Sequence, residues 1–240
     1  MFIPIGDAND PGARTPVLTW SFLVINVVVF FYQQMSPAFT YGYSLIPREI
    51  VTFQDIAGVV VLNGGMLQLF EGPSPVQLTL VTSMFMHGGW MHLLGNMLYL
   101  WVFGDNVEDR LGSWGFLKFY LLCGVIAAAC QILISPLSYI PVLGASGAIA
   151  GVLGAYLALF PGNRVKMWVF VFIIPVPAAI VLLLWIVAQF QGGLGNVLAP
   201  GDGGGVAYAA HIGGFIAGFV LGLRERKKKR GAVDFNGLGR

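Results

Sequence analysis

A serine set among glycines, three histidines and an asparagine are the side chains of this 240-residue sequence that can do chemistry together. Ser146 stands in a Gly-Ala-Ser-Gly stretch, residues 144–147, at the start of a strongly apolar segment. A serine there can be a small packing residue that lets two membrane helices approach closely. It becomes a nucleophile if an imidazole takes its hydroxyl proton while the oxygen attacks a carbonyl carbon. His211 is the candidate base.

These residues lie in a chain that is too apolar for a soluble domain. Hydrophobic residues make up 57% of it and charged residues only 10%, with a mean hydropathy of +0.78. Soluble domains carry about 25% charged residues. Several apolar runs approach or exceed the ~17 residues that are needed to cross a bilayer. We therefore predict an all-α membrane protein, a bundle of six transmembrane helices.

The expected spans are joined by short connections and one long loop. They cover residues 17–32, 78–103, 114–134, 146–160, 167–190 and 206–223. The long loop, residues 33–76, has apolar pieces too short to span, so we expect an interfacial and partly helical segment. Residues 104–112 read as a charged turn, and residues 191–205 as a mobile, glycine-rich loop. Pro175 and Pro177 are expected to kink the fifth span.

Basic residues indicate how the bundle is oriented. With both termini in the cytoplasm, twelve of the thirteen Lys and Arg residues lie on the inner side, and only Arg48 lies outside. The chain then divides into a cytoplasmic segment (1–16), a six-span domain (17–223) and a basic cytoplasmic tail (224–240). We expect the run Arg224–Arg230 to contact the anionic inner leaflet, and we expect no nucleic-acid partner.

Spans two, four and six run in the same direction in this topology. His92, Ser146 and His211 each lie about 12–14 residues, or ~18–21 Å of helix, from the inner end of their span. They share one depth within the hydrocarbon, where unpaired polar groups are costly, so they should face one another.

Small residues indicate that spans four and six are in contact. Stripes of small residues at helical spacing, which permit close backbone approach, are Gly147, Ala150, Gly151 and Gly154 in span four and Gly214, Gly218 and Gly222 in span six. Pairing the stripes in register brings Ser146 beside His211. A bundle without chemistry would also use such stripes, and the aligned hydroxyl and imidazole favour the nucleophile.

A serine and histidine in contact here would act as a dyad, because no Asp or Glu lies near the depth of His211. The first turn after Ser146 leaves backbone N–H groups free to face a developing oxyanion. His92 and Asn96 lie four residues apart on one helix face and can supply further donors. They can equally form a hydrogen-bonded pair that only joins helices.

With these residues placed, the chain resembles the rhomboid family of intramembrane serine proteases from about residue 79 to 223. Residues 144–147 match the family motif Gly-x-Ser-Gly, and Ala-His-Ile-Gly-Gly at 210–214 matches its sixth-span histidine motif. The second-span pattern of two histidines and an asparagine also matches, as does the charged segment 108–112 after it. The roles implied or assigned are nucleophile for Ser146, general base for His211, oxyanion stabilisation for His92 and Asn96, and structural support for His87, Gly144, Gly147, Gly151, Gly214 and Gly218.

Two positions depart from the family pattern, and neither removes a reacting group. Leu78 and Thr79 stand where many members carry a Trp-Arg pair in the first long loop. Ala150 stands where many members carry an aromatic residue on which the histidine ring rests. Other packing must then orient His211, or the dyad is looser.

The resemblance implies hydrolysis of peptide bonds in or near the transmembrane segments of single-span membrane proteins, which enter between spans two and five. No cofactor and no metal are expected, and the expected location is the cytoplasmic membrane of a prokaryote. The alternative is a non-catalytic relative that binds or retains client helices. A transporter fits less well because the spans lack carboxylates, and a metalloprotease because no His-Glu-x-x-His occurs.

Overall fold

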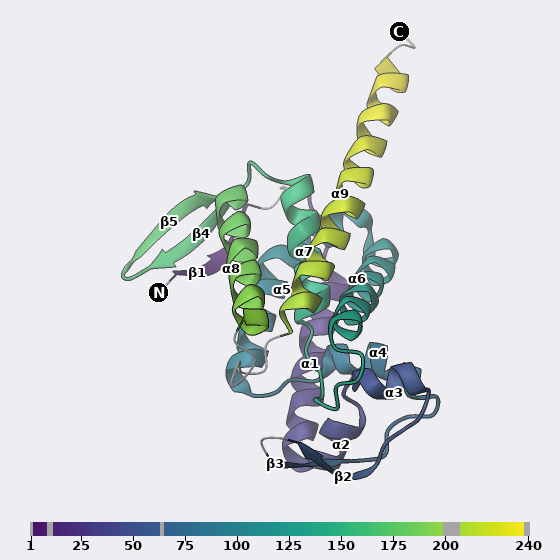
Figure 1. Ribbon diagram of the computed structural model, residues 1–240. Helices are drawn as coiled ribbons and strands as arrows, with labels where there is room; N and C mark the ends of the chain where they lie inside the picture. Colours follow the sequence, from purple (N-terminus) through teal and green to yellow (C-terminus); the bar gives the residue numbers. More distant parts are fainter. Residues whose placement is uncertain (1, 9–11, 63–64, 199–206, 238–240) are drawn as a thin grey trace.

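Six long helices dominate the computed structural model, which describes residues 2–8, 12–62, 65–198 and 207–237 (Figure 1). They are α1 (Val17–Met35), α5 (Trp90–Leu111), α6 (Ser113–Ile134), α7 (Ser146–Leu159), α8 (Ala178–Leu198) and α9 (Tyr208–Gly237). Helix α7 is central, since it packs against α5, α6, α8 and α9, and eleven of its fourteen residues are buried.

The outer surface of the bundle is apolar. By length and composition, α1 and α6 could each cross a membrane, while α7 and residues 178–194 of α8 are shorter apolar helices. Large side chains on α1 point outward, including Val24 at 62% exposed and Val28 at 61%. Contiguous exposed apolar surface of this kind is typical of a face that contacts lipid.

Three of the predicted spans agree closely with helices. Helix α7 begins at Ser146, as predicted, and α6 differs from the predicted 114–134 by one residue. Helix α1 extends three residues beyond the predicted end. In the sixth position, α9 continues from the predicted span through the basic tail to Gly237.

The predicted second span was wrong at both ends. Residues 76–85 form three short turns, η1 (Val76–Leu78), α4 (Thr79–Thr82) and η2 (Ser83–Phe85), and the chain is non-helical at 86–89 before α5 starts. The expected charged turn at 104–112 is instead the last part of α5. The helix can carry charge there because the buried Glu108 accepts hydrogen bonds from the N–H groups of Leu18 and Thr19, at 2.9 and 2.7 Å. Glu108 thereby caps the first turn of α1.

The predicted fifth span was wrong in nearly its first half, residues 167–177, where the otherwise helical fold contains strands. Strands β4 (Arg164–Val169) and β5 (Phe172–Pro177) form a hairpin there, and β1 (Phe2–Gly6) adds to it in the order β1-β4-β5. Pro175 and Pro177 kink no helix. They lie in the edge strand β5, where a missing N–H costs no ladder bond.

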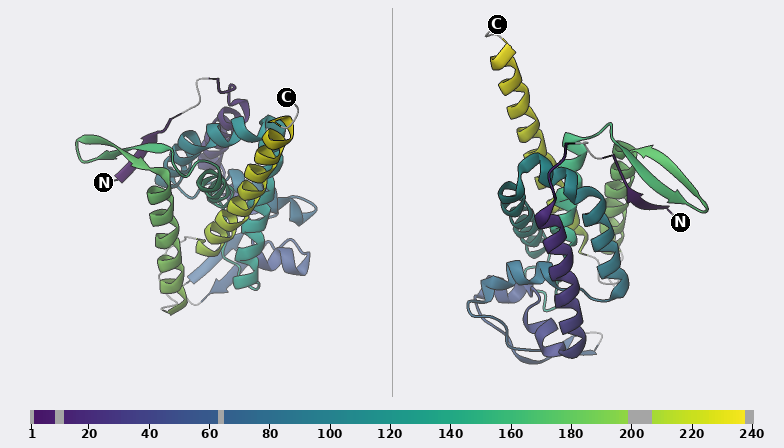
Figure 2. Two further views of the ribbon diagram at one scale, coloured as in Figure 1. Left: turned by 90° about the horizontal axis from the view of Figure 1, so that it is seen from above. Right: turned by 180° about the vertical axis from the view of Figure 1, so that it is seen from behind.

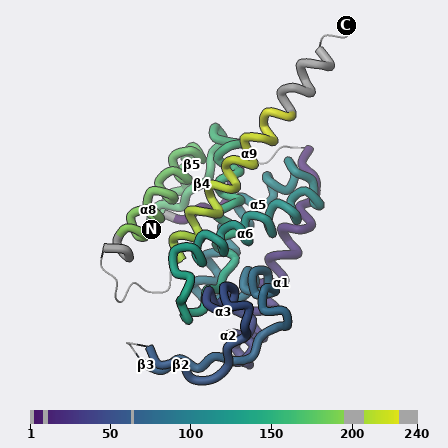
Figure 3. The backbone as a smooth tube through the Cα atoms, turned by 45° about the vertical axis from the view of Figure 1, so that its right-hand side comes forward, coloured from purple at the N-terminus to yellow at the C-terminus, as the bar shows by residue number. Residues whose placement is uncertain are grey.

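The long loop is partly helical, as predicted, and gathers at the end of the bundle away from the carboxyl end of α9 (Figure 3). It contains α2 (Pro37–Gly42), α3 (Pro47–Thr52) and a second hairpin, β2 (Gly58–Leu62) with β3 (Gly65–Leu69). Leu45 and Val142 exchange two backbone hydrogen bonds, of 2.9 and 2.7 Å, which tie this loop to the segment before Ser146. Helix α8 extends to Leu198, and the rest of the predicted loop 191–205 lies outside the described residues.

Asp7 fixes the amino-terminal segment to the bundle. Its carboxylate accepts hydrogen bonds from the Tyr156 hydroxyl on α7 and from Nδ2 of Asn106 on α5, the latter at 2.7 Å. Burial raises the pKa of Asp7 from 3.8 to about 6, against the lowering effect of the Tyr156 hydrogen bond. The folded protein therefore binds a proton at Asp7 more tightly than the unfolded chain does.

We predict that the stability of the protein depends on pH through the Asp7 carboxyl. Since the pKa of Asp7 is raised on folding, its stabilising contribution is complete at low pH and is lost as the pH rises from about 4 through about 6. Asp7→Asn cannot titrate. As the pH is raised from about 4 to about 6, the unfolding temperature of the wild type should decrease relative to that of Asp7→Asn in the same detergent. Parallel curves for the two proteins would contradict the assignment.

Candidate active site

The site depends on a close contact between α7 and α9, which glycines make possible. A Cβ on Gly218 would overlap the carbonyl oxygen of Gly151, and a Cβ on Gly214 would overlap that of Gly147. The small-residue stripes predicted from the sequence therefore do face each other. Because the two backbones touch, the first turns of α7 and α9 are held side by side.

Ser146 and His211 meet at this contact. Ser146 is the first residue of α7, and His211 lies in the first turn of α9. Nε2 of His211 lies 2.7 Å from Oγ of Ser146. The sequence-predicted contact is thus present in the structure, with both side chains half-buried. An unprotonated Nε2 in this position can accept the hydroxyl proton.

Gln189 on α8 determines which nitrogen of His211 carries the proton. Its Oε1 lies 2.7 Å from Nδ1 of His211. An amide oxygen can only accept, so Nδ1 is the donor and Nε2 of the neutral ring is free to accept from Ser146. The Nε2 amide group of Gln189 donates to the carbonyl of Trp185, at 3.5 Å, which favours this orientation.

Sequence reasoning missed Gln189 because it searched for a carboxylate. A signal was available, since Gln189 is the only side chain with an amide, hydroxyl or charge in the predicted span 167–190. A polar residue in such a run indicates a functional position.

Trp185 supplies an aromatic neighbour for His211. The two ring centroids lie 5.9 Å apart, with the planes inclined at 37°. The small Ala150, which stands in α7 where an aromatic residue was expected from the resemblance, is fully buried. The histidine ring is therefore supported from α8 rather than from α7.

His92 lies over the turn that leads into Ser146. Gly144 has φ +133°, and a Cβ there would come within 2.7 Å of Cε1 and Nε2 of His92, so the position requires glycine. Nδ1 of His92 accepts a hydrogen bond from the N–H of Gly88, at 3.3 Å. The neutral ring then carries its proton on Nε2, beside Gly144 and the hydroxyl of Ser146.

Asn96 and the first turn of α7 carry further hydrogen-bond donors. Asn96 follows His92 by one turn of α5 and is 8% exposed, and its Nδ2 has no hydrogen-bond partner in the described part of the chain. The first turn of α7 leaves N–H groups without intrahelical partners, the first helical bond running from Ile149 to Ala145 at 2.9 Å. Buried unpaired donors are costly unless a ligand uses them.

His87 lies outside the helix, in the segment before α5, and packs against His92. The two ring centroids are 5.1 Å apart, in an edge-to-face arrangement. Gln33 of α1 holds the backbone of His87 by accepting from its N–H at 2.9 Å and donating to its carbonyl at 3.2 Å. His87 thus fits a supporting position, and Gln33 is a second residue that the sequence reasoning missed.

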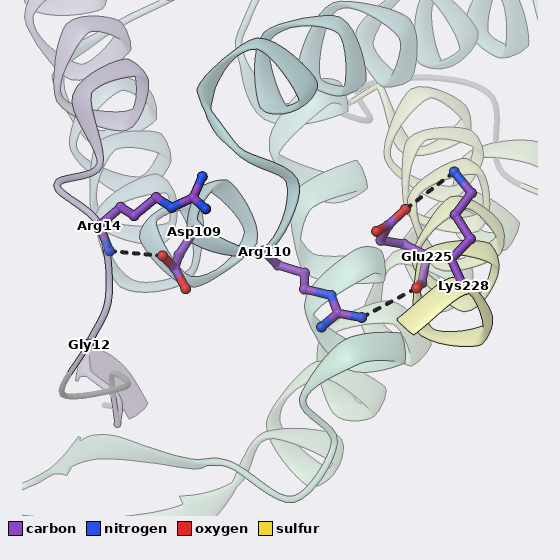
Figure 4. Close-up of a pocket in the computed structure, with 6 residues that line it drawn as sticks. All are labelled: Gly12, Arg14, Asp109, Arg110, Glu225 and Lys228. Carbon is purple, nitrogen blue, oxygen red and sulfur yellow. Dashed lines mark hydrogen bonds and ion pairs between the residues drawn. The ribbon is translucent and has the colours of Figure 1, made fainter. Parts of the chain in front are cut away.

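A charged cavity of about 540 Å³ lies at the other end of α5 (Figure 4). Its lining residues are Gly12, Arg14, Asp109, Arg110, Glu225 and Lys228. The Arg14 N–H donates to Asp109 at 2.8 Å, and Arg110 donates to the Glu225 carbonyl at 3.3 Å, which joins the segment before α1, the end of α5 and the middle of α9. Asp109 is 17 residues beyond His92, or ~25 Å along the helix, so this cavity is not part of the serine–histidine site. Among the described residues no group of three or more His, Cys, Asp or Glu could hold a metal ion.

The sequence of this chain is similar to those of several known proteins. Residues 76–228 match the sequence profile of the Rhomboid domain. The chain is 31% identical to "Rhomboid protease GluP" of Bacillus subtilis over 208 residues, which are 87% of this chain and 35% of that protein. It is 30% identical to "Rhomboid protein 1, mitochondrial" of Saccharomyces cerevisiae over 212 residues, 85% of this chain and 52% of that protein.

A third relative is nearer to this chain in length. "Putative rhomboid protease YdcA" of Bacillus subtilis is 28% identical over 216 residues, which are 88% of this chain and 94% of that protein. By contrast, the chain spans only about a third of GluP and about half of the yeast protein.

The glycine contact yields a prediction about stability. Gly218→Ala should push α9 away from the Gly151 carbonyl and lower the free energy of unfolding by about 1–3 kcal/mol, as overpacking does. Gly95→Ala is the matched helical control, because a Cβ at Gly95 meets nothing within 4 Å. Thermal unfolding in detergent distinguishes the two variants, and equal unfolding temperatures would contradict the close contact.

Gln189 yields a prediction about the reactivity of Ser146. In Gln189→Leu the Nδ1 proton loses its acceptor, so the favoured tautomer loses about 1–1.5 kcal/mol, or roughly tenfold in the reaction of Ser146 with a fluorophosphonate. Gln191→Leu makes the same chemical change at an exposed position of α8 and should react at the wild-type rate. An unchanged rate for Gln189→Leu would exclude the orienting role.

Proposed function

Because the chain belongs to the rhomboid family, we propose that it is an intramembrane serine endopeptidase that hydrolyses peptide bonds in or near transmembrane segments of membrane proteins. The observation that carries this proposal is the 2.7 Å contact between Oγ of Ser146 and Nε2 of His211. The names of the relatives GluP and YdcA, both rhomboid proteases, support it.

The contact suits a two-step acyl transfer. Oγ of Ser146 attacks the carbonyl carbon of the scissile peptide bond, and Nε2 of His211 takes the hydroxyl proton. His211 then gives that proton to the leaving amine, and the carbon–nitrogen bond breaks to leave an ester on Ser146. Water attacks the ester with His211 again as the base, which releases the carboxylic acid and restores the serine.

The oxyanion of each tetrahedral intermediate needs donors that are already in place. We assign this role to Nε2–H of His92, to Nδ2 of Asn96 and to the N–H groups in the first turn of α7. The fixed Nδ1 of His92 and the unpaired amide of Asn96 support the assignment. His87 and the glycines at 144, 147, 151, 214 and 218 serve as structural support.

We propose that α1, α5, α6, α7, α8 and α9 each cross the membrane, with both termini in the cytoplasm. Residues 17–223 then form the protease domain, and residues 1–16 and 224–240 flank it. The charged cluster of Figure 4 supports an inner side at this end of the bundle, because it gathers charged residues from the segment before α1, the end of α5 and the part of α9 that follows residue 223. The distribution of Lys and Arg along the sequence supports the same orientation.

Single-span membrane proteins are the proposed substrates, and they enter between α5 and α8. In the described part of the chain α8 packs against α7 and α9 but not substantially against α5, so few contacts between α5 and α8 would be lost if a substrate entered between them. The run Arg224–Arg230 would contact anionic lipids of the inner leaflet. We propose the cytoplasmic membrane of a prokaryote as the location, in line with the near full-length match to the Bacillus protein YdcA.

Cleavage of a co-expressed single-span test substrate checks the proposal. Ser146→Ala removes the nucleophile and His211→Ala removes the base, so product formation should fall by roughly 10²–10⁴-fold or more in each. Ser21→Ala is the matched serine control and should cleave normally, because the Ser21 hydroxyl is half-buried on α1 and bonds to the Val17 carbonyl of its own helix. Anti-epitope blots of both substrate halves give the readout.

Undiminished cleavage by Ser146→Ala would refute the mechanism. If the wild type neither cleaves any of a panel of helices nor reacts with a fluorophosphonate, while still retaining a co-expressed client, the non-catalytic alternative is the correct one.

A further inference from the structure

The β4–β5 hairpin is an apolar projection from the bundle that the proposed chemistry does not use. Residues 167–176 contain no charged, hydroxyl or amide side chain. The hairpin ends where α8 begins and slants outward from the helices, with its turn at the far end (Figure 2). Its inner residues Val165 and Met167 are buried against the core, which fixes its base.

The outer half of the hairpin is exposed on both of its faces. Neighbouring residues of a strand point to opposite faces, yet Phe172, Ile173 and Ile174 are all exposed, at 66%, 61% and 45%. Phe170 and Val171 at the turn are 75% and 81% exposed. An apolar surface on both sides of one sheet would be unfavourable in water.

The turn itself is unusual for an aqueous hairpin. Val169 pairs with Phe172, so the loop consists of Phe170 and Val171 alone. Two-residue loops strongly prefer Asn-Gly or Asp-Gly, because they require positive φ. Phe170 adopts φ +54°, which is strained for an aromatic residue and points to a function for its side chain.

Charge and backbone chemistry indicate how deep the hairpin lies. Arg164 and Lys166 are exposed at its base, on the same face of β4 as Trp168. Cations at the base, an indole beside them and apolar residues at the tip match a headgroup-to-acyl boundary. The open edge of the sheet rules out a position at the hydrocarbon centre of the bilayer, where unpaired backbone groups are costly. Pro175 and Pro177 lower this cost near the boundary, because they leave β5 with two fewer unpaired N–H donors.

The same apolar surface continues onto α8. Ile180, Leu183, Leu184 and Val187 are exposed by 51%, 51%, 66% and 49%. The hairpin thus extends a helix face that already suits lipid, and does so at the end of the bundle where α5 carries Arg110 and α9 carries Glu225 and Lys228.

We propose that the β4–β5 hairpin inserts its Phe170–Phe172 tip into the acyl-chain boundary of one leaflet, with Arg164 and Lys166 at anionic headgroups. The leaflet is the one at the basic-tail end of the protein. A bilayer is favoured over a second copy or a client helix because both faces, and not one, are apolar and exposed. The inference does not depend on whether Ser146 is catalytic.

Site-directed fluorescence in lipid nanodiscs tests this placement. Val171→Cys, in a Cys123→Ala and Cys130→Ala background, is labelled with a small polarity-sensitive fluorophore and exposed to doxyl-phospholipid or to iodide. Gly162→Cys is the matched control, since it lies in the exposed turn before β4 where a Cβ meets no atom within 4 Å. We expect lipid quenching and iodide resistance at position 171, and the reverse at position 162.

Either other outcome at position 171 overturns the proposal. Quenching by iodide would put the tip in water, and resistance to both quenchers would mean that protein covers it. Arg164→Gln with Lys166→Gln provides a second measurement on the same label. It should reduce the lipid quenching in nanodiscs of phosphatidylglycerol but not in those of phosphatidylcholine, and no difference would refute the role of the two cations. Elution as one species and cooperative thermal unfolding establish that each labelled variant is folded.

Discussion

Backbone contact between α7 and α9 is the constraint on which the rest of the structure depends. A side chain at Gly214 or Gly218 would overlap the backbone of α7 and hold these helices apart, and one at Gly147 or Gly151 would press α7 against Ala127 or Cys123 of α6. The serine and the histidine come from residues 65 positions apart, and neither could reach the other across a wider gap. Packing of small residues, which drives helix association in lipid, is here also what creates the reactive pair.

The sequence predicted the parts of the fold that follow from helical period and from polar residues inside apolar runs. It placed α7 to within a residue of its limits and brought Ser146 to His211 through the glycine spacing. It did not predict the hairpin at 164–177, because a long apolar run has no period that separates a buried or lipid-facing strand from a helix. The break at 86–89 was missed for a related reason, since no proline marks it and its glycines are tolerated within helices.

Gln189 and Trp185 show a different limit of sequence reasoning. Each lies on α8, far along the chain from the residues it touches, and only tertiary packing brings the amide to Nδ1 of His211. Trp185 of α8 thus takes the place of the aromatic ring that was expected at position 150 of α7. Orientation of the base therefore depends on where α8 lies, which links the peripheral helix to the chemistry at the centre of the bundle.

The two hydrogen bonds between Leu45 and Val142 have a consequence for how this architecture can vary. Val142 is bonded to Leu45, and the N–H of Gly144 donates to the carbonyl of Ser83. Ser146 is the first residue of α7. Alternate residues of this short segment are therefore held by three different parts of the chain. Insertions between 46 and 75 leave those anchors in register, whereas a single-residue insertion between 142 and 146 does not. Natural variation and loop exchange among relatives should therefore be tolerated in the outer loop and forbidden in the four residues before the serine.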